Sequence, residues 1–145
     1  MRSSAASDVY KRQVFNYLDY LIWKNDRNLY KDFTFEFRNS VEHWYPRHPT
    51  ESEIKTWNDE GVDRFGNLCI IQRNVNSKFY NLPPEGKKTS FRSMIEKGSL
   101  KLRLMSKLTA PGNGIPASQN WKDHVCAEHE REMINLLSKA CGLEE

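Results

Sequence analysis

The sequence predicts an α+β fold in which helices flank a small core of two strands. Apolar residues recur at helical spacing within residues 14–25, which indicates an amphipathic helix. Two later segments have the pattern of strands: FTFEFR (33–38) alternates phenylalanine with polar residues, and LCII (68–71) is a short apolar run. Residues 121–140 are expected to form a terminal helix. Helices at both ends with strands between them define the α+β class.

The first strand leads toward a charged and aromatic stretch, SVEHWYPRHP. Glu42 and His43 lie at its end, and Pro46 and Pro49 stop the strand and begin an irregular loop. A short helix is expected over about residues 50–59.

Three later segments are also assigned from local pattern. The asparagine-rich segment 74–81 is expected to start a helix after the second strand. SLKLRLM (99–105) alternates leucine with basic residues, which indicates one buried face and one charged face. PGNGIP (111–116) is expected to be a loop.

Length and charge favour a single domain with an uneven surface. The chain has 145 residues, 38% of them hydrophobic, which is enough for one modest core. The formal net charge is only +3, but residues 86–107, here called the basic segment, carry seven lysines or arginines against one glutamate. This asymmetry suits a polyanion bound on one face, and on charge alone a solvated basic surface explains it equally well.

The number and spacing of the cysteines and the hydropathy of the chain favour a cytoplasmic location. Cys69, Cys126 and Cys141 form no CxxC pair and leave an odd count, so neither a disulfide framework nor a four-cysteine zinc site is indicated. No apolar run approaches the roughly 18 residues that a membrane span requires, and no signal peptide is visible. We therefore expect a reducing compartment and no membrane partner.

Residues 1–13 do not resemble the start of a domain. DVYKRQ (8–13) resembles a translated sequencing-adapter end, so we expect residues 1–13 to be a non-native or disordered leader. Residues 14–145 are then one domain, cut from a longer protein whose upstream domains are missing.

Four motifs in a fixed order carry a resemblance to a known family. They are FEFRNSVEHWYP, FGNLCII, NSKFYN and PPEGKK, and together they span about residues 33–88. In this order the chain resembles the HNH, or His-Me finger, nuclease domain at the C-terminus of GmrSD-type modification-dependent restriction endonucleases. The resemblance implies a ββα-metal core over about residues 33–90 and a C-terminal helical part over about residues 91–145.

The resemblance also implies roles for four residues. His43 would be the general base, Glu42 a carboxylate ligand of the metal, Asn76 a second, neutral ligand, and Asn67 the residue that holds the loop carrying the base. Phosphodiester hydrolysis needs a base to deprotonate water and a cation to neutralise charge on the phosphate. A neutral imidazole can supply the first, and Mg²⁺ or Mn²⁺ the second. Family members often have Asp where this chain has Glu42.

Each of these residues also has a purely structural interpretation. A histidine between Glu and Trp is often hydrogen-bonded within the fold, GNL can be a turn before a strand, and Asn76 can cap a helix. The combination of all four favours the catalytic interpretation.

Basic residues near the base are candidates to bind DNA phosphates. They are Lys78, Lys87, Lys88 and Arg47, of which Lys87 stands where the family keeps a lysine. A solvated basic loop is the alternative.

Two functions remain open from the sequence. The first is a metal-dependent DNA endonuclease domain, the cutting module of a restriction or defence enzyme that acts on DNA, modified or not. The second is a nucleic-acid-binding module with the same fold and little or no cleavage activity. The Glu-His pair with both asparagines favours the first, because binding alone needs no base beside a metal ligand.

Overall fold

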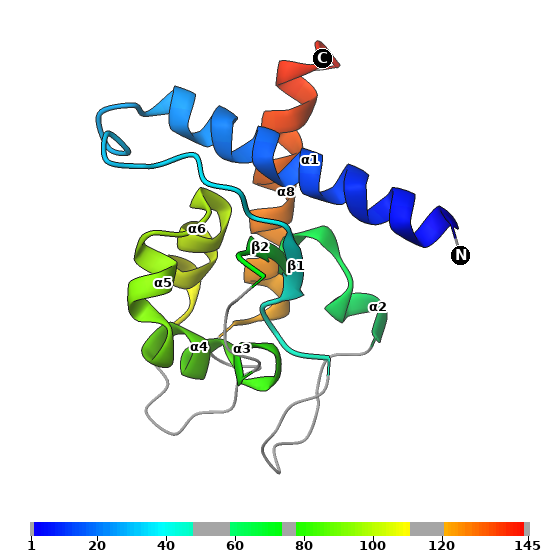
Figure 1. Cartoon of the computed structure of the whole chain (residues 1–145), viewed down its shortest axis with the longest axis vertical. Coiled ribbons are helices and arrows are strands. Elements are labelled where there is room, and N and C mark those ends of the chain that lie inside the picture. Colours follow the sequence, from blue (N-terminus) through cyan, green and yellow to red (C-terminus); the bar gives the residue numbers. More distant parts are fainter. Residues whose placement is uncertain (1, 48–58, 74–77, 111–120, 144–145) are drawn as a thin grey trace.

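The computed structural model describes residues 2–47, 59–73, 78–110 and 121–143 (Figure 1). Helices surround one small sheet, which confirms the α+β class. In chain order the elements are α1 (Arg2–Asn25), β1 (Ser40–His43), α2 (Asp59–Val62), the 3-10 helix η1 (Phe65–Asn67), β2 (Leu68–Ile71), α3 (Lys78–Asn81), α4 (Pro84–Ser90), α5 (Arg92–Glu96), α6 (Leu100–Leu108) and α8 (Asp123–Ala140).

β1 and β2 form an antiparallel pair in which Ser40 lies opposite Ile71 and His43 lies opposite Leu68. All four residues of β2 are buried, whereas those of β1 are half-buried. The predicted strand at residues 68–71 is therefore confirmed, and it begins directly after η1.

The predicted strand at residues 33–38 is wrong, because the first strand is β1. Of the three phenylalanines expected on a buried face, only Phe33 is buried, and Phe35 and Phe37 are 54% and 81% exposed. The physical reason is the length of β2. It ends at Ile71, whose partner is the first residue of β1, so β2 offers no residue with which 33–38 could pair.

Arg38, one of the polar residues that alternate with phenylalanine in that segment, is buried. Its Nη2 donates to the carbonyl oxygens of Thr34 (3.3 Å) and Lys97 (3.0 Å), and its guanidinium lies over the ring of Phe33. The segment before β1 is thus held by side-chain contacts and not by a strand ladder.

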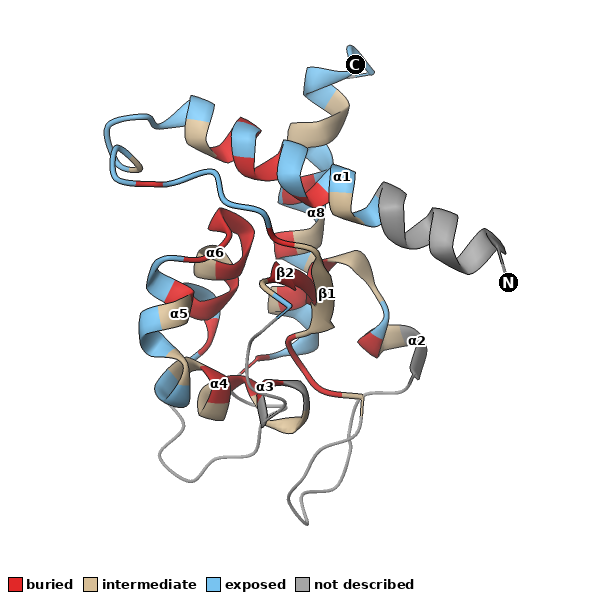
Figure 2. Cartoon of the chain, in the orientation of Figure 1, coloured by how far each residue is buried: buried red, intermediate tan, exposed pale blue. Residues whose placement is uncertain are grey.

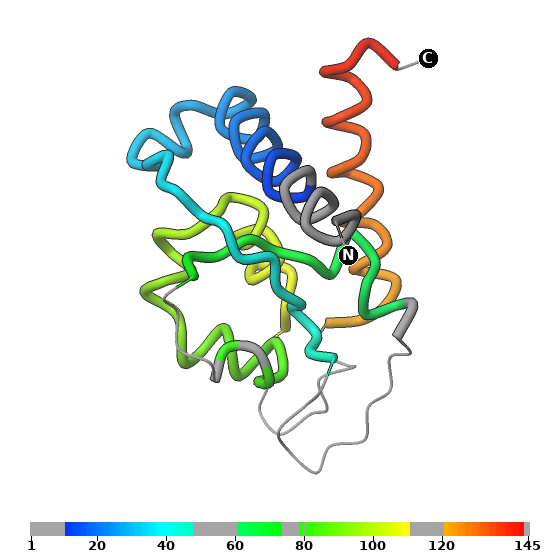
Figure 3. The backbone as a smooth tube through the Cα atoms, turned by 45° about the vertical axis from the view of Figure 1, so that its right-hand side comes forward, coloured from blue at the N-terminus to red at the C-terminus, as the bar shows by residue number. Residues whose placement is uncertain are grey.

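Helix α1 lies across α6 and α8 (Figure 3). It ends at Asn25, as predicted, and extends back to Arg2 through the residues expected to form a leader. Asp19 of α1 is buried, and its Oδ1 accepts hydrogen bonds from the Ser99 hydroxyl (2.8 Å) and the Leu100 N–H (2.9 Å). A side chain from α1 therefore caps the first turn of α6.

The alternating segment at residues 99–105 forms the start of helix α6, so the expectation of a charged face there is wrong. Lys101 is fully buried, and its Nζ donates to the carbonyl oxygens of Phe65 (3.1 Å) and Leu68 (2.6 Å). Lys101 therefore cannot line a DNA path, because its ammonium is held inside the fold.

The buried residues gather between the sheet, α6 and α8 (Figure 2). Trp121 and Met133, just before and in the terminal helix, are buried. The main cluster joins the loop after β1 to α3, α6 and α8, and its largest members are Trp44, Tyr45, Phe79 and Trp121. A second cluster packs α1 against α6 and α8 through Leu18, Ile22, Phe33, Leu100 and Met133.

Within the part of the chain that the structure describes, no helix has the length and apolar character that crossing a membrane requires. The three cysteines are free thiols; Cys69 and Cys126 are buried and Cys141 is exposed.

Candidate active site

The end of β1 brings His43 against Asp63. The His43 Nε2 lies 2.8 Å from the Asp63 Oδ1, and the two side chains are 27% and 51% exposed. Partial burial lowers the pKa of His43, although the hydrogen bond and the negative charge of Asp63 oppose this change. The imidazole is therefore neutral near pH 7, and Nε2 is the ring nitrogen that faces the carboxylate. Its Nδ1 has no hydrogen-bond partner among the described residues, so it can accept a proton.

Asn67 ties together the segments on either side of this contact. Its Oδ1 accepts from the Tyr45 N–H (2.8 Å) and the Trp121 Nε1–H (3.0 Å). Its Nδ2 donates to the carbonyl oxygens of Tyr45 (3.1 Å) and Val62 (2.8 Å). The fully buried amide thus makes all four of the hydrogen bonds available to it. It fixes the loop after His43 relative to the residue that precedes Asp63.

The glycine before Asn67 lets η1 approach α8 closely. A Cβ at Gly66 would lie 2.6 Å from the carbonyl oxygen of Cys126 and 2.8 Å from the Cβ of Glu130. The Gly66 N–H donates to the Glu130 Oε1 (2.9 Å). The Gly-Asn pair therefore combines a residue that needs close packing with one that needs four polar partners.

Lys87 is buried beneath the end of β1 and binds its backbone. Its side chain is buried, and its Nζ donates to the carbonyl oxygens of His43 (2.8 Å) and Trp44 (2.9 Å). Burial lowers the pKa of Lys87 to about 7, against the opposing influence of Cys69 and Glu42. The expected contact between Lys87 and DNA phosphate is not supported by this position, because both partners of the ammonium are internal carbonyls.

Glu42 lies next to His43 on β1, and neighbouring side chains in a regular strand alternate between its two faces. The two can serve one site because β1 ends at His43. The Ser40 hydroxyl donates to the Glu42 Oε1 (2.6 Å), and Oε2 accepts no hydrogen bond from the described residues. Burial raises the pKa of Glu42, while Ser40 and the charge of Lys87 act in the opposite direction. The carboxylate is thus half-buried with one oxygen still available.

The remaining predicted site residues are Arg47, Lys88, Lys78 and Asn76. Arg47 donates from Nη2 to the Asp63 Oδ1, and Lys88 donates from Nζ to the carbonyl oxygen of Thr109 (2.8 Å). Lys78 is the first residue of α3, but its side chain is not among the described parts. Asn76, the second expected metal ligand, lies outside the described residues, as do residues 50–58 of the helix expected over about residues 50–59.

Two site contacts were not predicted from the sequence. Asp63 carried no motif signal, and its distance in sequence from His43 hides their contact. The sequence placed Trp121 only at the start of the expected terminal helix, but its indole N–H donates to Asn67. The available signal was chemical, because a buried indole N–H needs an acceptor.

The residues at the end of β1 fit one part of a magnesium site. Glu42 offers a hard carboxylate oxygen whose burial would be stabilised by a cation. In the described ranges no group of three or more His, Cys, Asp or Glu side chains is arranged to hold a metal ion. Magnesium needs no such group, because it often binds through one or two protein ligands, waters and substrate phosphates. Glu42 is therefore compatible with the predicted metal.

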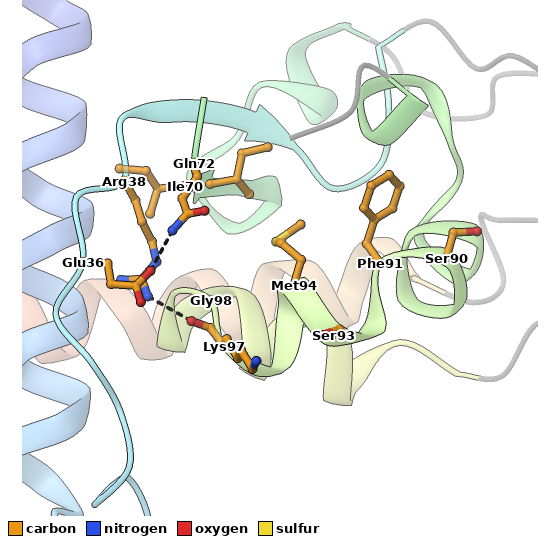
Figure 4. A pocket seen from close by; sticks show the side chains of 11 residues that line it. Glu36, Arg38, Ile70, Gln72, Ser90, Phe91, Ser93, Met94, Lys97 and Gly98 are labelled. Atoms are coloured by element: carbon orange, nitrogen blue, oxygen red, sulfur yellow. Dashed lines mark hydrogen bonds between the residues drawn. The ribbon is translucent and has the colours of Figure 1, made fainter. Parts of the chain in front are cut away.

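A separate cleft of about 490 Å³ opens between β2, α4 and α5 (Figure 4). Phe91 and Met94 line its apolar part, and the Gln72 Nε2 donates to the Glu36 Oε2 (2.7 Å) at its polar part. None of the predicted site residues lines it, so the cleft is distinct from the end of β1 at His43.

One protein-family model matches nearly the whole chain. The family model described as "GmrSD restriction endonucleases, C-terminal domain" matches residues 1–136. Comparisons with curated proteins and with solved structures found no match. The match covers the end of β1, Asn67 and most of α8, and the chain therefore belongs to the family of GmrSD restriction endonuclease C-terminal domains.

Proposed function

We propose that the end of β1 is the cutting site of a metal-dependent DNA endonuclease of the HNH type. The observation that carries the proposal is the position of His43. Its imidazole is partly exposed, held by Asp63, and neutral near pH 7 because burial lowers its pKa. A base that is neutral at the working pH is what deprotonation of water requires.

In the proposed reaction His43 accepts a proton from a water molecule through the ring nitrogen that does not contact Asp63. The water oxygen forms the new bond to phosphorus as the bond from phosphorus to the leaving oxygen breaks. The leaving oxygen then takes a proton from solvent. Glu42 and Asn76 are the proposed ligands of Mg²⁺ or Mn²⁺, which would neutralise charge on the phosphate and the leaving oxygen.

The order of elements supports the ββα-metal interpretation. β1, β2 and α3 come in this order along the chain, with α2 and η1 between the two strands. His43 lies at the end of the first strand and Asn67 just before the second. Asn67 acts in the proposal through hydrogen bonds to the loop after His43, and it does not touch the substrate.

The proposed substrate is DNA, which is what the restriction endonuclease family implies. Arg47 and Lys88 remain proposed phosphate contacts, and Lys78 joins them at the start of α3. We also propose that the domain works in the cytoplasm as the cutting module of a longer restriction enzyme, on DNA that is modified or not.

A plasmid-nicking assay on the full chain tests the function. We expect supercoiled plasmid to be nicked with Mg²⁺ and not with a chelator, and His43→Ala to abolish nicking while DNA affinity is retained. His124 is exposed on α8, so His124→Ala is the matched control and should cleave like the unaltered chain. DNA binding without metal-dependent nicking would favour the alternative function, a binding module with little cleavage activity.

A further inference from the structure

Asp63 makes a contact with His43 that the family resemblance did not supply. The carboxylate Oδ1 lies 2.8 Å from Nε2 of the imidazole, at the point where α2 has just ended. We propose that Asp63 is a positioning residue that holds the neutral imidazole with its proton on Nε2 and its lone pair on Nδ1. This inference rests on the proposed function, because it gives the tautomer in which His43 acts as the base.

A neutral imidazole has two tautomers, and only one of them suits each arrangement of partners. If the proton were on Nδ1, Nε2 would direct a lone pair at the Asp63 carboxylate, which can only accept hydrogen bonds when it is ionised. That arrangement is repulsive. The carboxylate therefore selects the Nε2–H form and leaves Nδ1 able to take a proton from water.

The distance between the two residues is set by Asn67. The Asn67 Nδ2 donates to the carbonyl oxygens of Tyr45 and Val62. Tyr45 is two residues after His43, and Val62 is one residue before Asp63. Both carbonyls and the amide are interior groups, and Trp121 fixes the other end of the amide. The His43–Asp63 contact is thus held by the buried frame on which both residues sit.

Arg47 keeps the carboxylate in the form that the proposal needs. Its Nη2 donates to the same Oδ1 that His43 contacts. The hydrogen bonds from Arg47 and His43 lower the pKa of Asp63. The carboxylate therefore stays ionised at neutral pH and remains an acceptor for the imidazole N–H.

A single-turnover nicking assay tests the effect on rate. Asp63→Asn keeps the shape but can present an amide N–H to Nε2, which favours the other tautomer, so we expect the rate to fall at least tenfold with unchanged DNA affinity. Asp63→Glu keeps the carboxylate and should recover part of the rate. Asp123→Asn is the matched control, because Asp123 is also an exposed partner of an arginine, and it should cleave like the unaltered chain. A rate for Asp63→Asn within twofold of the unaltered chain would overturn the proposal.

The tautomer itself can be read in the unaltered chain, whether or not it cleaves DNA. Nitrogen-15 NMR of His43 at pH 8 should show the proton on Nε2 and a lone pair on Nδ1, and Asp63→Asn should shift this balance. A proton on Nδ1 in the unaltered chain would contradict the inference about Asp63. A chain with the expected tautomer that fails to nick DNA with Mg²⁺ would instead contradict the proposed function and leave the positioning contact standing.

Discussion

Two buried lysines support the same end of the sheet, one under each strand. Lys87 of α4 donates to the carbonyl oxygens of His43 and Trp44, where β1 ends. Lys101 of α6 donates to those of Phe65 and Leu68, where β2 begins. Both side chains have essentially no exposed surface.

The two lysines differ in the part of the structure to which their carbonyl partners belong. Lys87 holds the backbone of His43 itself, so it acts on the proposed base. Lys101 holds η1 and the start of β2, and it contacts the rings of Phe15 and Phe65 as well. The basic segment is therefore partly internal, with one of its buried lysines holding the proposed site and the other holding the fold.

The largest expected effect is the loss of stability in Lys101→Ala. The variant leaves two interior carbonyl oxygens without their donor and creates a cavity, so we expect the free energy of unfolding to fall by about 3 kcal/mol or more. Urea unfolding followed by circular dichroism measures this change. Lys107 is exposed on the same helix, and Lys107→Ala should stay within about 0.5 kcal/mol of the unaltered chain. Equal losses in the two variants would show that Lys101 is not a structural donor.

Replacing each lysine by methionine should separate the site from the fold. Met keeps the bulk of the side chain and removes the ammonium in both cases. At a temperature where both variants are folded, we expect Lys87→Met to cleave at least tenfold more slowly than the unaltered chain, because the backbone of His43 loses its anchor. Lys101→Met should cleave within about threefold of the unaltered chain in the same nicking assay, because the Lys101 ammonium does not contact the backbone of His43. The reverse order of rates would contradict the assignment of Lys87 to the site.

The buried ammonium of Lys101 should make stability depend on pH. Burial lowers the pKa of Lys101 from 10.5 to about 8. Between these values the unfolded chain holds a proton that the folded chain has lost, so stability increases as pH rises through 8. From pH 7 to pH 9 we expect the unaltered chain to gain about 1 kcal/mol over Lys101→Met. Urea unfolding at the two pH values checks this, and a difference that stays constant would show that Lys101 titrates normally.

Lys101 should contribute almost nothing to DNA binding. A lysine with no exposed surface cannot neutralise a phosphate, so Lys101→Met should leave the salt dependence of DNA binding unchanged. Arg92 is in the same basic segment and its side chain is 82% exposed, so Arg92→Ala should flatten the log-log slope by about one unit. Fluorescence anisotropy over a salt series measures both slopes. A flatter slope for Lys101→Met would mean that the ammonium leaves its buried position when DNA binds.

The elements that were predictable from the sequence are those whose pattern is local. The strand at residues 68–71, the end of α1 and the terminal helix each follow from their own apolar spacing. The alternation at residues 33–38 failed because a strand also needs a partner, and β2 is too short to supply one. The alternation at residues 99–105 failed because a lysine can be buried when carbonyl oxygens receive its ammonium.

The candidate site was predictable in its motif residues and not in its contacts. Glu42, His43 and Asn67 stand out through the order of motifs, which a sequence displays directly. The contact of Asp63 with His43 depends on how α2 returns to the end of β1, and no local pattern contains that distance. The internal role of Lys87 was hidden for the same reason, because charge in a sequence does not reveal burial.

We propose that the imidazole of His43 supplies the base, and chemical rescue of a variant without this imidazole tests the proposal most directly. His43→Ala leaves space at the end of β1, next to the intact carboxylates of Glu42 and Asp63. We expect added imidazole to restore part of the Mg²⁺-dependent nicking rate of His43→Ala, with a dependence on imidazole concentration that saturates or rises linearly, and to leave the unaltered chain unaffected. A His43→Ala variant that nicks as fast as the unaltered chain without imidazole would contradict the claim.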